Sequence, residues 1–315
     1  MPGLITHYIG GQAVLQALPK DLKDFIGREQ QIYNLGTQGP DIFFYYMMGM
    51  LKQKTRGIGQ MMHQQDLGCV FLHMADEIKR ARSKKEQRVI FAYMAGFIVH
   101  YALDAHTHPY VYSQTSSDGS GLLNSVNHRR LETIIDVIML KTSSGSKPAA
   151  LKLWRLIAPE ELAMVAAAGA LSHAIKKTYN RKVSDYDVYT AMRNMIKWTK
   201  LLQSYKGRRK KWMELAEDLT IRAHALSCMV HMQEVPDDYD YLNLNKKSWT
   251  PPWAACEDSR NNSFAELYES AIIDATDMLK NLYSYVEGKI SRGELAEVIG
   301  NRSLKTGENR AGACV

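Results

Sequence analysis

The sequence is poor in cysteine. Its four cysteines, at positions 69, 228, 256 and 314, form no C-x-x-C pair. This scatter excludes a disulfide-dense small scaffold and a thiolate zinc site, and it predicts reduced thiols in a cytoplasmic protein. The opening MPGLITHYIGG lacks a basic region followed by an apolar run, so no signal peptide is expected.

Long hydrophobic runs are also scarce. Ile42–Leu51 is too short to span a bilayer, and Val89–Leu103 leads into His100 and Asp104. The second run therefore predicts a buried core helix, so no transmembrane segment is expected and any membrane contact would be peripheral. No alternating strand pattern persists and no solenoid repeat is visible, whereas helical periodicity dominates. The predicted fold class is all-α.

Several common catalytic motifs are missing. The chain has no Walker A loop, no Rossmann fingerprint, no G-x-S-x-G, no H-E-x-x-H, no E-x-x-H and no His-Asp doublet. These absences argue against P-loop NTPases, dinucleotide enzymes, α/β-hydrolases, zincin proteases, di-iron bundles and the helical His-Asp phosphohydrolases.

Basic residues are in mild excess. The 315 residues include 40 Lys and Arg against 33 Asp and Glu, a formal charge of +7. The excess favours anionic partners such as phosphate esters, nucleic acid or anionic lipid. Its densest patches, Lys79–Arg88 and Lys206–Lys211, lie in helical patterns and suit either solvated helix faces or contact with phosphate or lipid.

The helices are expected to form one domain over residues 1–300, with a loose tail at 301–315. Ser83-Lys84-Lys85-Glu86 is a capping box that predicts a long helix to about His106. Later helices are expected at about 159–180, 184–205, 208–231 and 263–290.

The strongest chemical signal is His100-x-x-x-Asp104-x-x-x-His108 within that long helix. At ~100° per residue these positions form one stripe on one helix face. A carboxylate buried beside imidazoles is costly unless a positive charge compensates it, and a divalent metal does so naturally. His106 competes with His108, because a residue before Pro109 is biased away from helical dihedrals.

A second pair, His128-x-x-x-Glu132, has the same one-turn spacing, which lets two ligands meet one ion. Upstream candidates are His7, Asp41 and His63, although Asp41 also suits a helix N-cap. Mixed carboxylate and imidazole ligands without thiolate indicate catalytic Zn²⁺, with Mn²⁺ and Fe²⁺ less suited.

In this order, the set resembles the zinc-dependent phospholipase C family, whose relatives include the catalytic domain of glycosylphosphatidylinositol phospholipase D and the S1/P1-type nucleases. The resembling segments, THYIGGQAVL, GPDIFFY and HYALDAHTH, lie within about residues 1–140. The best-known members of the family begin, after processing, with a Trp whose amine and carbonyl bind zinc, and this chain has no such Trp. Pro2, exposed by removal of Met1, is our candidate replacement.

The resemblance implies an all-α fold, two to three zinc ions and phosphodiester hydrolysis by zinc-activated water. It implies that Asp41, His63 and His100 hold one ion, and that Asp104 bridges to a second held with His7 and the N-terminus. His108, His128 and Glu132 would hold the third. Asp41 would orient or deprotonate the water, which makes Asp41 and Asp104 the expected catalytic residues.

The leading function is hydrolysis of a phospholipid or a related phosphoester. A nuclease or nucleotidase on the same cluster is the first alternative, although no strip of exposed aromatic and basic residues suits base stacking. A non-catalytic helical protein stabilised by its metals is the second.

Overall fold

The computed structural model describes residues 3–45, 52–116, 121–203, 208–218, 227–235, 239–255 and 257–310. Within these ranges the chain is built from helices joined by loops, which confirms the all-α class. The elements are α1 Leu4–Ala17, α2 Lys20–Gly27, α3 Gln30–Gly36, η1 Gly39–Phe44, α4 Lys52–Gln64, α5 Leu67–Arg80, α6 Lys84–Thr115, α7 Gly121–Ser144, α8 Leu153–Leu156, α9 Glu161–Tyr179, α10 Asp185–Leu202, α11 Arg208–Asp218, η3 Ser227–Met229, α12 Phe264–Val286 and α13 Arg292–Ile299.

Helix α6 is the central element. Ser83 caps it by accepting a hydrogen bond from the Glu86 N–H (3.1 Å). By length and composition α6 could cross a membrane, but 94% of its most apolar window is buried inside the protein. That burial identifies α6 as the core helix that the sequence predicted.

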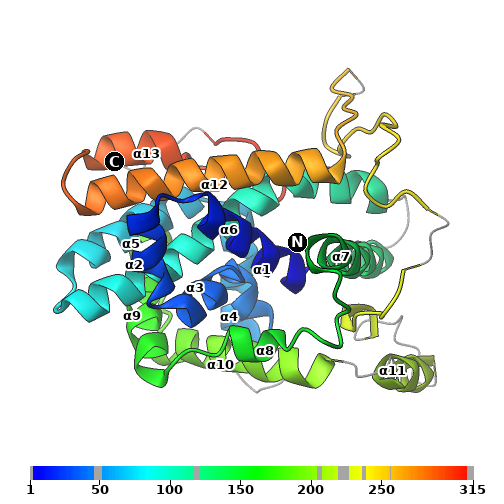
Figure 1. Ribbon diagram of the computed structural model, residues 1–315, viewed down its shortest axis with the longest axis horizontal. Helices are drawn as coiled ribbons and strands as arrows, with labels where there is room; N and C mark the ends of the chain where they lie inside the picture. The colour runs from blue at the N-terminus through cyan, green and yellow to red at the C-terminus, as the bar shows by residue number, and fades with distance from the viewer. Residues whose placement is uncertain are drawn as a thin grey trace.

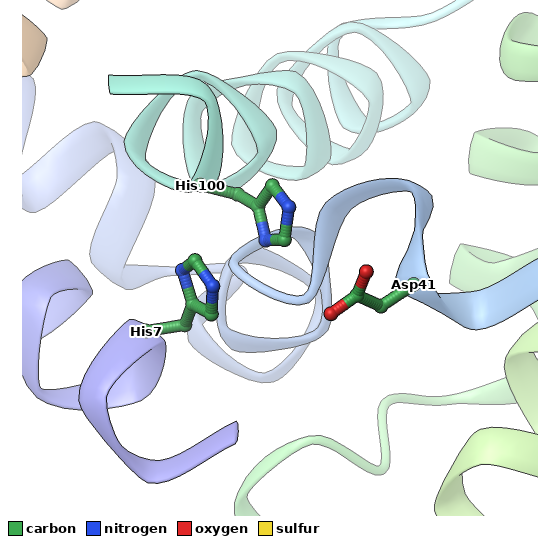
Figure 2. A group of neighbouring side chains, drawn as sticks. All are labelled: His7, Asp41 and His100. Atoms are coloured by element: carbon green, nitrogen blue, oxygen red, sulfur yellow. The ribbon is translucent and has the colours of Figure 1, made fainter. Parts of the chain in front are cut away.

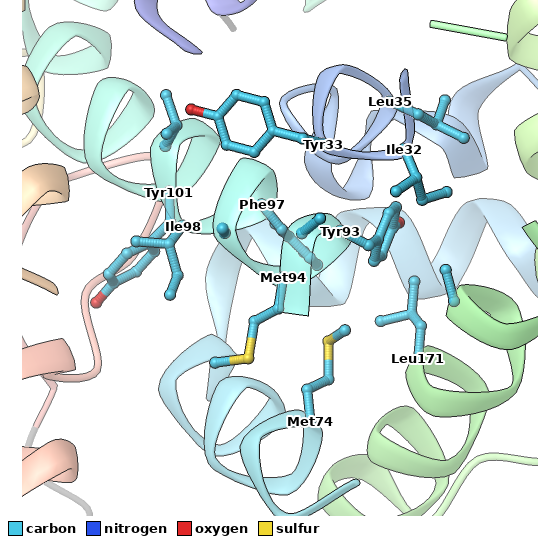
Figure 3. Close-up of a cluster of buried hydrophobic side chains, with 14 of the residues drawn as sticks. Ile32, Tyr33, Leu35, Met74, Tyr93, Met94, Phe97, Ile98, Tyr101 and Leu171 are labelled. Carbon is cyan, nitrogen blue, oxygen red and sulfur yellow. The ribbon is translucent and has the colours of Figure 1, made fainter. Parts of the chain in front are cut away.

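The other helices pack around α6. Helix α12 runs along it, and α3, α5 and α9 cover its remaining faces, while α9 packs on α10 (Figure 1). Figure 3 shows side chains from α3, α5, α6 and α9 interlocking, including Tyr33, Met74, Phe97 and Leu171. Burial of such large side chains contributes about 1.5–3 kcal/mol each.

Helices α3 and α6 cross with their backbones in contact. A Cβ at Gly36 would lie 2.2 Å from the Tyr93 carbonyl oxygen, and one at Gly96 would lie 2.1 Å from the Tyr33 carbonyl oxygen. Only glycine permits this approach. The crossing brings the end of α3, and η1 after it, against the ring of His100.

Helix α6 continues to Thr115, well beyond the expected end near His106. Pro109 has no N–H to donate to the carbonyl of Ala105, which normally interrupts a helix. Here the backbone of Gly307 packs on that carbonyl so closely that a Cβ would lie 2.3 Å from its oxygen. The Ala105 carbonyl, which has no N–H donor at Pro109, is therefore covered by the backbone of Gly307.

The C-terminal expectations need correction. Residues 301–310 are not a loose tail, because Ser303 and Leu304 are buried and the segment packs on α6; residues 311–315 lie outside the described ranges. The expected helix at 208–231 is described as α11 and η3. Cys69 is disulfide-bonded, which corrects the expectation of reduced thiols for that residue, whereas Cys228 is buried and not disulfide-bonded.

Candidate metal centre

All eight predicted ligands lie in one buried cluster. His7 comes from α1, Asp41 from η1 and His63 from α4, while α6 and α7 supply the others. Three groups each offer ligand atoms that lie within 4.8 Å of one another: His7, Asp41 and His100; His63, His100 and Asp104; and His108, His128 and Glu132. Figure 2 shows the first group, in which three side chains from three elements point toward one another.

Asp104 stands at the centre of the cluster. One carboxylate oxygen lies 3.3 Å from His7 Nε2, and the other lies 3.1 Å from His100 Nε2. That second oxygen is also 3.9 Å from His63 Nε2 and 3.7 Å from His108 Nδ1. Asp104 itself has no exposed surface. One buried carboxylate thus faces imidazoles from three helices.

These close approaches are not hydrogen bonds. Both oxygens of Asp104, one of Asp41, both nitrogens of His7, and Nε2 of His100 and His108 are buried without a hydrogen-bond partner among the described residues. Two ligands bound about 2.05 Å from a tetrahedral zinc are about 3.3 Å apart. The separations of Asp104 from His7 and His100, 3.3 and 3.1 Å, match that spacing, so these residues fit a metal centre.

Three of the histidines, His63, His100 and His108, share a second feature, a hydrogen bond between Nδ1 and a backbone carbonyl that turns Nε2 toward the cluster. His63 Nδ1 pairs with the Gly59 carbonyl (2.7 Å), and His100 Nδ1 with the Thr37 carbonyl (3.1 Å). His108 Nδ1 pairs with the Leu304 carbonyl. Such partners fix the tautomer and ring orientation of a metal-binding histidine.

The third group joins α6 to α7. His128 Nε2 lies 2.8 Å from a carboxylate oxygen of Glu132, one turn along α7, and His108 Nε2 lies 3.8 Å from the same oxygen. The ring of Tyr112 contacts those of His108 and His128, at centroid distances of 5.7 and 4.5 Å. This grouping is the one that the family resemblance implies.

The first two groups differ from the ligand sets that the family resemblance implies. Asp41 and His63 do meet, with Nε2 of His63 3.2 Å from an Asp41 oxygen. His7, however, stacks on His100 with ring centroids 4.0 Å apart, so His100 belongs to both groups. Any N-terminal ligand at Pro2 lies outside the described residues.

The pKa shifts of the cluster residues favour the binding of a cation. Burial opposes the charged form of Asp104, yet His108 and His100 hold the pKa of its carboxyl well below the usual range. Burial likewise opposes the charge on Glu132, and His128 holds its pKa well below normal. Burial lowers the pKa of His108 to about 4. The carboxylates are therefore anionic and His108 is neutral at pH 7, as metal ligands must be.

The pKa values of the two histidines in the first group shift in opposite directions. Burial lowers the pKa of His7, and the neighbouring His100 lowers it further. Burial also disfavours a charged His100, but the Asp104 carboxylate outweighs it and raises the His100 pKa.

Asp136 supports the site, although its sequence pattern did not single it out. The buried Asp136 carboxylate accepts hydrogen bonds from the N–H groups of Ile5 (3.1 Å) and Thr6 (2.7 Å) at the start of α1, and it lies 2.6 Å from His231 Nε2. It therefore anchors the helix that carries His7. Its position could have been noticed in the sequence, because Asp136 lies four residues after Glu132, just as Glu132 lies four residues after His128.

The remaining histidines lie elsewhere. His106 Nε2 lies 3.0 Å from Asp274 on α12, outside the cluster. His173 is 42% exposed and lies 3.7 Å from Glu77. His231 lies 2.6 Å from Asp136, and His224 lies outside the described residues.

An aromatic and cationic edge borders the third group. The Tyr112 ring packs against Trp253 with centroids 5.4 Å apart. The Lys305 ammonium lies 5.4 Å from the Tyr112 ring and 5.9 Å from the Trp253 ring. Lys305 is exposed, so this edge carries a positive charge facing solvent beside His128.

A comparison with protein families now places the chain. The family model for zinc dependent phospholipase C matches residues 6–208, which is more than half of the chain. The protein belongs to that family. The match reaches beyond the expected 1–140 and takes in α9 and α10. No curated protein and no solved structure matches the chain.

Proposed function

We propose that this protein is a zinc-dependent phosphodiesterase that hydrolyses a phospholipid or a related phosphoester in the manner of a phospholipase C. Membership of the family supports metal-dependent phosphoester chemistry. The observation that carries the proposal is Asp104, a fully buried carboxylate whose two unpaired oxygens face His7, His63, His100 and His108. A folded protein retains such an arrangement when a cation completes it.

Zinc bound here would polarise the phosphoryl oxygens and lower the pKa of a water molecule. The residues that would hold it are His7, Asp41, His63, His100, Asp104, His108, His128 and Glu132. Asp41 would accept a proton, as the family resemblance implies, and its oxygen lies 3.2 Å from Nε2 of the partly exposed His63. Asp104 would supply the negative charge that the surrounding imidazoles face.

The surroundings suit an anionic ester. Lys305 supplies a positive charge beside the third group, and Tyr112 and Trp253 offer aromatic surface to the rest of the substrate. A monoanionic phosphodiester with an apolar or neutral substituent matches both features. The net charge of +7 favours its approach.

We further propose peripheral contact with a lipid surface through α11. Trp212 and Leu215 on this helix are 69% and 53% exposed, and Lys211 beside them is exposed as well. Exposed aromatic and aliphatic side chains next to basic residues suit an anionic membrane interface. The double variant Trp212→Ala, Leu215→Ala should cosediment less with phosphatidylserine vesicles, whereas Tyr186→Ala on α10, equally exposed, should not.

A substrate panel tests the main proposal. Zinc-loaded protein is assayed on phosphatidylcholine in mixed micelles, on bis(p-nitrophenyl) phosphate and on single-stranded DNA. Lipid or small-ester turnover that Asp104→Asn abolishes and His173→Gln retains is the expected result. Turnover of DNA alone would favour the nuclease alternative. Zinc binding without turnover of any phosphodiester would favour a structural role for the metals.

A further inference from the structure

The segment that follows α13 reaches the metal centre, although it lies outside residues 6–208 that define the family match. Leu304 is fully buried, and both of its backbone polar groups contact site histidines. Its N–H donates to the His63 carbonyl (3.0 Å), and its carbonyl accepts from His108 Nδ1. We call residues 300–310 the C-terminal clasp.

The clasp is held in place on both sides of Leu304. Before it, the Tyr101 hydroxyl donates to the Ile299 carbonyl (3.0 Å) and accepts from the Arg302 N–H (2.8 Å). After it, Gly307 packs on the Ala105 carbonyl with no room for a Cβ. Both anchors lie on α6, the helix that carries His108, so the clasp and the histidine cannot shift independently.

The contact with His108 has a chemical consequence. A carbonyl oxygen only accepts hydrogen bonds, so it holds the proton of the neutral imidazole on Nδ1. The lone pair is then on Nε2, which lies 3.8 Å from the Glu132 carboxylate and has no hydrogen-bond partner among the residues that the structure describes. Without the clasp, either tautomer and other ring orientations become available to His108.

We propose that the C-terminal clasp is part of the metal centre, and that the Leu304 peptide is a positioning group that presents His108 through Nε2 to the ion held with His128 and Glu132. Partners of this kind typically change metal affinity 10–100-fold when they are lost. The proposal rests on the metal centre proposed above, but on neither the substrate nor the reaction.

Two glycine substitutions separate this role from general stability. Gly307→Ala places a Cβ 2.3 Å from the Ala105 carbonyl oxygen and forces the clasp away from α6. Gly288→Ala is the matched control: its φ of +76° resembles the +72° of Gly307, but no described residue lies within 4 Å of its added Cβ. Both variants carry the strain of a left-handed alanine, and only the first displaces the clasp.

Zinc affinity is measured by chelator competition at 25 °C on variants that retain the wild-type far-UV circular dichroism. We expect about 10–100-fold weaker binding of one zinc equivalent in Gly307→Ala, and an altered visible spectrum after Co²⁺ substitution. Gly288→Ala should match wild type in both measurements. Unchanged affinity in Gly307→Ala, or an equal loss in both variants, would overturn the proposal.

A measurement on the wild-type protein covers the case in which Gly307→Ala does not fold. Long-range ¹H–¹⁵N correlations of the zinc-loaded full-length chain report which nitrogen of His108 carries the proton. A proton on Nδ1 supports the proposal, and zinc on Nδ1 refutes it. If wild-type protein binds no zinc at all, the proposed function fails, whereas zinc bound with the opposite His108 tautomer rejects the clasp alone.

Discussion

Replacing Asp104 with asparagine should separate a metal ligand from a structural carboxylate. Asparagine keeps the shape of the side chain but removes the charge that His7, His63, His100 and His108 surround. If zinc then binds about 100-fold more weakly, the linked loss of stability is about 2.7 kcal/mol at saturating metal. At about 2 °C per kcal/mol for a chain of this size, the Tm of the zinc-loaded protein falls by about 5 °C.

The metal-free protein should respond in the opposite way. Without zinc, both oxygens of Asp104 are buried and unpaired, and replacing buried charge by a neutral group of similar volume is often neutral or stabilising. His100 also loses the carboxylate that raises its pKa and stays neutral. The Tm of the chelated Asp104→Asn variant should therefore equal or exceed that of chelated wild type.

The assay is differential scanning calorimetry with zinc and with chelator, together with phosphodiesterase activity. Activity should fall on the order of 10²-fold or more, as it does when preorganised electrostatic groups are lost. Asp76→Asn is the control, because this carboxylate pairs with Tyr285 and Arg292 far from the cluster and should lower both Tm values equally. An equal drop with and without zinc in Asp104→Asn would show that Asp104 is structural.

The remaining predictions concern the same centre. Purified protein should hold two or more zinc ions, and chelation should lower its Tm by several degrees; less than one equivalent after reconstitution would contradict the ligand set. His108→Gln should lose a zinc equivalent while His106→Gln keeps all of them, and the reverse would defeat the helix-face argument. Burial lowers the pKa of His108 to about 4 from an ordinary 6.5, so the folded metal-free protein binds fewer protons than the unfolded chain between these values. The contribution of His108 to stability should be complete above pH 6.5 and decline as the pH falls toward 4, and a Tm that does not fall across that range would argue against a neutral buried His108. Finally, Lys305→Met should raise KM for an anionic phosphodiester about two- to fivefold with kcat little changed, as expected for one exposed charge; an unchanged KM would place the substrate elsewhere.

The part of the site that could be predicted from the sequence is the part that α-helical periodicity determines. His100, Asp104 and His108 share a face because they are one turn apart, and His128 and Glu132 do so for the same reason. Family membership and the all-α class were accessible as well, since ligand order along the chain and apolar periodicity are both local patterns.

Tertiary structure decided the rest. No local spacing relates His7, Asp41 and His63 to α6, because they come from α1, η1 and α4. Gly36 and Gly96 let α3, and η1 after it, approach α6 closely enough to bring Asp41 into the cluster. Contacts between distant segments depend on crossing angles and loop paths, which side-chain periodicity does not encode. For that reason the anchoring role of Asp136, the continuation of α6 past Pro109 and the Leu304 contacts with two site histidines became visible only in the folded chain.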